Sequence, residues 1–62
     1  MNQQSFYSDR QLATRYSVTR QTIWRWTREG VMPKPMRIGK AATRWDGSVI
    51  QAWEDAKREA AQ

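Results

Sequence analysis

Two helix-start signals, close together in the sequence, constrain the fold of this chain most. Ser8 and Gln11 form a capping box, in which the serine hydroxyl accepts from a first-turn amide and the glutamine side chain accepts from the serine amide. Thr19 is an N-cap candidate for a second helix. The first helix is therefore predicted from about Asp9 to Arg15, with a short break before the second. Two short helices joined by such a break are the helix-turn-helix pattern.

The segment after the second helix is predicted to form a β-hairpin. The second helix runs from Arg20 to Glu29 and ends at Gly30, a typical C-terminal residue. Two prolines soon afterwards exclude further helix, and residues 36–45 alternate apolar and polar side chains as strands do. The sequence GKAA in the middle can turn the chain. The hairpin would form a two-stranded wing beside the helix pair.

A third helix is predicted from Gly47 to Ala60, with Asp46 as its N-cap. One side carries an apolar stripe that we expect in the core, formed by Val49, Ile50 and Trp53. The other side includes three acidic residues, Glu54, Asp55 and Glu59. This acidic face is either a docking surface for another protein or simply a solvated face.

The fold class expected from these elements is mainly α with a small β-hairpin: a winged helix-turn-helix with a two-stranded wing and a C-terminal helix. Residues 6–62 would form this domain, preceded by a flexible N-terminus at residues 1–5. The sequence has no cysteine and no histidine, which excludes the usual zinc sites, thiol nucleophiles and histidine-based acid–base catalysis. The carboxylates form no clustered pair. We expect no catalytic residues, no metal and no cofactor, and therefore a protein that is not an enzyme.

The net charge of +5 is unevenly distributed. Residues 1–45 hold nine of the eleven basic residues against two acidic ones, whereas residues 46–62 hold two basic and four acidic residues. The first part would attract a polyanion such as double-stranded DNA. No apolar run reaches the length of about 20 residues that a membrane span needs, and the first residues are unlike a signal peptide. We expect an intracellular protein with no membrane partner.

The second helix has distinct inner and outer faces, because successive residues turn by about 100°. Ile23 and Trp26 face the core. Trp24 falls at the edge of the outer face, where it would pack on DNA or on a neighbouring protein, or else only shield the rim of the core. Thr19 at the cap is placed to bind a phosphate at the positive helix end. Arginine can fork to guanine and glutamine to adenine, which suits the remaining outward residues to a recognition helix: Arg20, Gln21, Arg25 and Arg28.

The predicted hairpin is basic along its outward side and tip, at Lys34, Arg37, Lys40 and Arg44. The wing of a winged helix touches the DNA backbone or the minor groove, and phosphate contacts contribute affinity and salt dependence more than sequence choice. If five phosphates are neutralised, log K should fall with log salt at a slope near −4.5, from about −0.9 per contact.

Several of these motifs occur together in a known family. VTRQTIWRW (18–26), REGVMPKPMRIG (28–39), TRW (43–45) and VIQAW (49–53) resemble the AlpA-like group of small phage and prophage regulators, which includes excisionases of the Cox and Xis kind. The resemblance implies a MerR-like winged helix and recognition-helix contacts at Arg20, Gln21, Thr22, Trp24, Arg25 and Arg28. It implies wing contacts at Lys40, Arg37 and Arg44.

The resemblance also implies a function in the bacterial cytoplasm, on the nucleoid when bound. We rank first an excisionase that binds and bends attachment-site DNA so that an integrase, its possible partner, excises the element. No long dimerisation helix follows the domain in this sequence, which favours copies associating head to tail on DNA over a dimer on a palindrome. The alternative is a transcriptional regulator of phage or prophage genes. A third hypothesis is a protein-binding inhibitor of a regulator or integrase.

Overall fold

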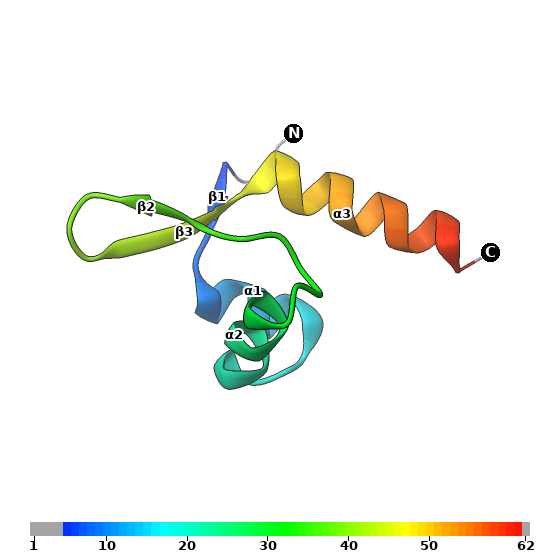
Figure 1. Cartoon of the computed structure of the whole chain (residues 1–62), viewed down its shortest axis with the longest axis horizontal. Coiled ribbons are helices and arrows are strands. Elements are labelled where there is room, and N and C mark those ends of the chain that lie inside the picture. Colours follow the sequence, from blue (N-terminus) through cyan, green and yellow to red (C-terminus); the bar gives the residue numbers. More distant parts are fainter. Residues whose placement is uncertain (1–4, 62) are drawn as a thin grey trace.

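The chain forms a strand, two helices, two further strands and a last helix (Figure 1). The structure, a computed structural model, describes residues 5–61, and residues 1–4 and 62 lie outside the described part. The elements are β1 (Phe6–Tyr7), α1 (Asp9–Tyr16), α2 (Arg20–Arg28), β2 (Met36–Ile38), β3 (Ala42–Asp46) and α3 (Gly47–Ala60). The fold is the predicted winged helix-turn-helix, mainly α-helical and with a C-terminal helix.

Local capping sets the starts of the first two helices. The Ser8 hydroxyl accepts from the Gln11 amide at 3.1 Å, and the Gln11 side chain accepts from the Ser8 amide at 2.9 Å. Thr19 caps α2 by accepting from the Thr22 amide at 3.1 Å. Between the helices, Ser17 adopts the left-handed conformation with a φ of 58°, which turns the chain. These contacts confirm the predicted helix-turn-helix.

The wing belongs to a three-stranded antiparallel sheet in the order β1-β3-β2. β2 and β3 form the predicted hairpin, with Gly39 at a φ of 73° in the turn. The sequence did not predict β1, whose Tyr7 pairs with Trp45 at the end of β3. Of the predicted flexible N-terminus only Ser5 is described, and its carbonyl accepts from the amide of Gly47 at 2.7 Å. The sheet thereby joins the early part of the chain to the start of α3.

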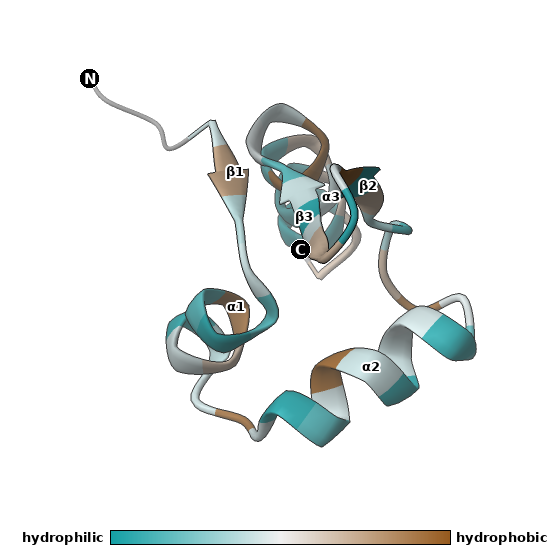
Figure 2. Ribbon diagram, turned by 90° about the vertical axis from the view of Figure 1, so that its left-hand side faces the viewer, coloured by the Kyte–Doolittle hydropathy of each residue, from teal (hydrophilic) through white to brown (hydrophobic). Residues whose placement is uncertain are grey.

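The core lies where the sheet and α3 meet the helix pair (Figure 2). Its buried residues are Tyr7, Leu12, Ala13, Ile23, Met32, Trp45 and Ile50. Trp26 and Trp53 pack against them partly buried, so their predicted inward direction is confirmed. The prediction of Val49 as a core residue is wrong, because its side chain is 45% exposed. The helix α3 projects beyond the helix pair (Figure 1), and only a narrow side of it meets the core.

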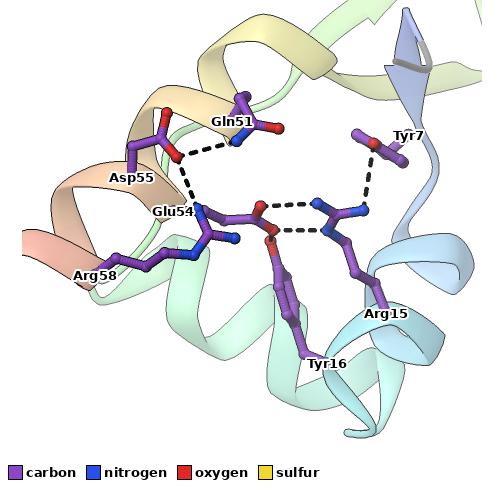
Figure 3. A network of polar contacts seen from close by, with 7 residues as sticks. All are labelled: Tyr7, Arg15, Tyr16, Gln51, Glu54, Asp55 and Arg58. Carbon is purple, nitrogen blue, oxygen red and sulfur yellow. Dashed lines mark hydrogen bonds and ion pairs between the residues drawn. The ribbon is translucent and has the colours of Figure 1, made fainter. Parts of the chain in front are cut away.

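A polar cluster fastens α3 to α1 (Figure 3). The Glu54 carboxylate accepts from the Arg15 guanidinium at 2.6 and 2.7 Å and from the Tyr16 hydroxyl at 2.5 Å. Only 11% of the Glu54 side chain is exposed. The prediction that Glu54 lies on the solvated acidic face is therefore wrong, because Arg15 reaches across from α1 and supplies a charged partner in a forked geometry.

The same cluster shifts the pKa values of its members. The hydrogen bond from Arg15 is the main reason that the pKa of Glu54 lies below its ordinary value of 4.5, against the opposing effect of burial. Burial, followed by the contact with Glu54, raises the pKa of Tyr16. Beside this cluster, the Trp53 indole N–H donates to the Val31 carbonyl at 3.0 Å. Its ring meets Tyr16 edge-on, with 5.9 Å between centroids. Ionic and aromatic contacts thus hold the same turn of α3.

Replacing Glu54 by glutamine should lower the free energy of unfolding by about 1 kcal/mol at neutral pH, since Arg15 is 37% exposed and water weakens the pair. The folded-state pKa of Glu54 is lowered, so the carboxylate stabilises the fold above its unfolded pKa and loses this effect as pH falls through the folded value. The difference in unfolding free energy between wild type and Glu54→Gln should therefore reach its full size above about pH 5. It should shrink as the pH falls below 4.5. Urea denaturation followed by circular dichroism at several pH values measures it.

Glu59→Gln on the exposed end of α3 is the matched control, because it removes the same charge from the same helix. We expect its unfolding free energy to stay close to that of the wild type at neutral pH. Equal losses in the two variants would mean that the charge of α3, and not the contact with Arg15, stabilises the fold.

Candidate nucleic-acid interface

The outer face of α2 forms a shallow hollow of about 530 Å³. It is lined by five residues that the sequence predicted as DNA contacts of this helix, namely Arg20, Gln21, Trp24, Arg25 and Arg28. All five are exposed, whereas Ile23 on the opposite face is fully buried. The helical wheel therefore separates the two faces correctly, and three guanidinium groups are presented together to solvent. Such a surface suits forked hydrogen bonds to phosphates and guanine edges.

The two threonines at the start of α2 are less available than these residues. The Thr19 hydroxyl accepts from the Thr22 amide and lies 3.0 Å from the Thr22 hydroxyl. Its side-chain oxygen therefore serves first as the helix cap, and Thr22 is half-buried. A phosphate contact at this end would draw on the positive helix terminus more than on the Thr19 oxygen.

A carboxylate from α1 organises one end of the hollow. Asp9 Oδ2 accepts from Arg20 Nε and Nη2 at 3.1 and 3.0 Å and from the Trp24 indole N–H at 2.9 Å. Burial alone would raise the pKa of Asp9, but the hydrogen bonds from Trp24 and Arg20 outweigh it and hold the pKa below its ordinary value. Sequence reasoning treated Asp9 only as a first-turn residue of a helix. The signal it missed is that Asp9 is one of two acidic residues in the basic part of the chain.

Trp24 joins this polar contact to the core. Its ring lies 5.1 Å from the ring of Trp45 at an interplanar angle of 56°, and its side chain is 37% exposed. The contacts with Trp45 and Asp9 match the alternative in which Trp24 shields the rim of the core. The exposed edge of the ring still lines the hollow.

The wing residues do not share one outward side. In the hairpin register Arg37 lies opposite Thr43, and Met36 lies opposite Arg44. Side chains alternate along β3, so Arg37 is on the side of the sheet where Trp45 meets α2, whereas Arg44 is on the other side. The prediction that both line one face is wrong, because it took no account of the register. Arg44 is also half-buried and donates to the Thr43 carbonyl at 2.9 Å.

Lys40 and Lys34 are both exposed, and they lie at opposite ends of β2. Lys40 lies in the hairpin turn, where the Arg37 guanidinium approaches its carbonyl at 3.5 Å. Lys34 lies in the segment that leads from α2 to β2. Figure 1 shows the hairpin extending away from α3, so the basic tip and the C-terminal helix lie at opposite ends of the molecule. Arg37 and Lys40 therefore belong to the part of the wing that lies away from α3.

Metal-ligand clusters and membrane-spanning helices are both absent from residues 5–61. No group of three or more acidic, cysteine or histidine side chains in that range is placed to hold a metal ion. Among the described helices, none combines the length and the apolar character that crossing a membrane requires.

Comparison with known proteins identifies a family. The family model described as "Prophage CP4-57 regulatory protein (AlpA)" matches residues 8–58, from the cap of α1 into the last turns of α3. The matched stretch contains the outer face of α2 and the whole wing. Neither the curated proteins nor the solved structures contain a significant match to the chain.

Replacing Trp24 by alanine should lower the free energy of unfolding by about 2–3 kcal/mol, since both the aromatic contact and a hydrogen bond to a charged group are lost. Trp24→Phe keeps a ring against Trp45 and should cost only about 1 kcal/mol. Urea denaturation followed by circular dichroism checks both values. The neighbouring exposed Arg25→Ala serves as the control and should leave the midpoint nearly unchanged. A Trp24→Ala protein as stable as the wild type would show that the ring serves the surface alone.

Proposed function

The chain belongs to the AlpA family of prophage regulatory proteins, and from this we propose that it binds a specific DNA site and regulates transcription of phage or prophage genes. Members of this family are regulatory DNA-binding proteins and not enzymes. The observation that carries the proposal is the exposed hollow on α2, where three arginines and a glutamine face solvent beside a basic wing.

Base recognition is proposed for α2. The second helix of a helix-turn-helix enters the major groove, and its N-terminal half contacts base edges. Gln21 lies in that half and Arg25 directly after it, and both side chains are exposed. Glutamine can form paired hydrogen bonds with adenine, and arginine with guanine. Arg28, one turn further on, would contact a phosphate at the groove edge. Thr22 and Thr19 would contribute through the first turn of the helix.

Contacts with the DNA sugar-phosphate backbone are proposed for the wing. Lys40 at the tip and Arg37 on the side facing α2 are the best placed cations, and Lys34 lies between helix and hairpin. Arg44, on the other side of the sheet, would take part only if the DNA wraps around the hairpin. Contacts of this kind strengthen binding to every sequence and make it sensitive to salt.

Excision, the role expected first from the sequence, is the second candidate, because the family description favours regulation. The observation that favours it is the size of the molecule, whose extents are 40 × 28 × 19 Å with one recognition helix. Such a unit covers about one DNA turn of roughly 34 Å. Firm binding would then need several copies, arranged head to tail or on inverted repeats. An integrase would have the exposed Asp55 and Glu59 of α3 as a contact surface.

Arg25→Ala and Lys40→Ala form a matched pair that tests the proposal. Arg25→Ala should weaken binding to the preferred site by about 1–3 kcal/mol and relax base choice at one position. Lys40→Ala should weaken binding to all sequences similarly and reduce the salt slope by about one. Fluorescence anisotropy with the selected site and with unrelated DNA, at several salt concentrations, measures both. If Arg25→Ala leaves the affinity and the footprint unchanged, α2 does not read the site.

The arrangement of copies decides between the two candidates. Binding to DNA that carries one half-site, two direct repeats or two inverted repeats should be compared, together with circular-permutation measurements of bending. Excision predicts cooperative binding to direct repeats with a bend. A regulator that acts without excision predicts binding to one half-site or to inverted repeats with little bending. A failure to bind any of the three DNAs would contradict both candidates.

A further inference from the structure

The Asp9 side chain of α1 hydrogen-bonds to two residues of α2. One oxygen, Oδ2, accepts from Arg20 Nε at 3.1 Å, from Arg20 Nη2 at 3.0 Å and from Trp24 Nε1 at 2.9 Å. The Asp9 side chain is only 17% exposed, whereas that of Arg20 is 57% exposed. The carboxylate is therefore tucked between α1 and α2, and the guanidinium extends from it into solvent.

The contact uses only one edge of the Arg20 guanidinium. Nε and one N–H of Nη2 point at Asp9. The outer edge, formed by Nη1 and the second N–H of Nη2, makes no hydrogen bond to the residues that the structure describes. That outer edge is the pair of parallel donors that matches O6 and N7 of guanine. Arg20 is also the first residue of α2, where a recognition helix meets base edges.

We infer that Asp9 is a positioning residue that holds the outer fork of Arg20 in the orientation for reading a guanine, and so contributes to sequence specificity without touching DNA. This inference rests on the proposed function. An arginine side chain has many rotamers and loses that freedom when it binds. Because Asp9 fixes the guanidinium before DNA arrives, part of this ordering has already taken place in the free protein.

The charge of Asp9 acts in the same direction. A carboxylate beside a DNA-binding face repels phosphates and therefore weakens binding to arbitrary sequences. It also offsets the charge of Arg20, so that this arginine contributes to affinity mainly where a base accepts its fork. Arg25 and Arg28 differ, because neither makes a side-chain hydrogen bond within the described residues. A substitution of Asp9 should therefore affect the base position read by Arg20 and leave the position that depends on Arg25 unaltered.

The test starts from the DNA sequence selected by the wild-type protein from a random library. Affinities for every single-base variant of that site are then measured for the wild type, Asp9→Ala, Arg20→Lys and the double variant. At the base position that Arg20→Lys disrupts, we expect a wild-type preference of about tenfold or more to fall below about threefold in Asp9→Ala. The double variant should lose nothing further at that position. Affinity of Asp9→Ala for unrelated DNA should equal or exceed that of the wild type.

Arg20→Lys keeps the charge and the partner of Asp9 but lacks the fork, so it tests whether the fork reads the base. If Asp9→Ala does not fold under assay conditions, Asp9→Asn, which keeps the shape of the side chain and removes its charge, takes its place in the same measurements. Circular dichroism establishes the folded fraction of each variant. A purely structural role for Asp9 predicts equal losses for all sequences, in proportion to the unfolded fraction. That result, or a base preference that survives in Asp9→Ala or in Arg20→Lys, would overturn the inference while the proposed function stands. A wild-type protein that selects no preferred sequence would instead refute the proposed function itself.

Discussion

The burial of Trp45 is the constraint on which the other parts of this small domain depend. Its side chain is 1% exposed, and it lies at the point where β1, β3, the segment before β2 and α2 meet. Its indole N–H donates to the Pro33 carbonyl at 2.8 Å, and its ring contacts Trp24. A chain of 62 residues without cysteine has no covalent link to hold these segments, so one large aromatic side chain supplies much of the common core. The wing and α2 are consequently fixed relative to each other through the same residue.

The C-terminal helix is attached by a different kind of contact. Ile50 enters the core, but the next turn of α3 is held by the Glu54 cluster and by the edge-on contact of Trp53 with Tyr16. The charged part of this attachment lies near the surface, where water weakens it. The helix therefore depends on a few specific side chains, and its outer half contributes little to the core. This explains why the apolar stripe of α3 is less buried than its periodicity suggests.

The helices and their ends could be predicted from the sequence because capping is local. Ser8, Thr19 and Asp46 each contact an amide two or three residues further along the chain, so their roles can be read from spacing alone. β1 could not be predicted, since two residues become a strand only through pairing with β3, which is distant in sequence. The burial of Glu54 also depends on a distant residue, Arg15.

The candidate site shows the same division between local and distant effects. The helical period alone separates the outer arginines of α2 from the buried Ile23. The two sides of the wing follow from the pairing register, and the contact of Asp9 with Arg20 and Trp24 follows from the packing of α1 on α2; neither can be read from spacing. The orientation of side chains on the outer face of α2 is thus decided by the tertiary contacts that also stabilise the fold.

That overlap limits which residues on the outer face of α2 can change without loss of stability. Trp24 lines the hollow on α2 and at the same time packs against Trp45 and donates to Asp9. A substitution there would alter stability and binding together. Arg25 and Arg28 carry no comparable contact within the described residues, so their replacement leaves the core intact. The outer face of α2 therefore has two kinds of position. If α2 reads DNA as proposed, new specificities would arise first at Arg25 and Arg28, whereas Arg20 and Trp24 are tied to Asp9 and would have to change together with it.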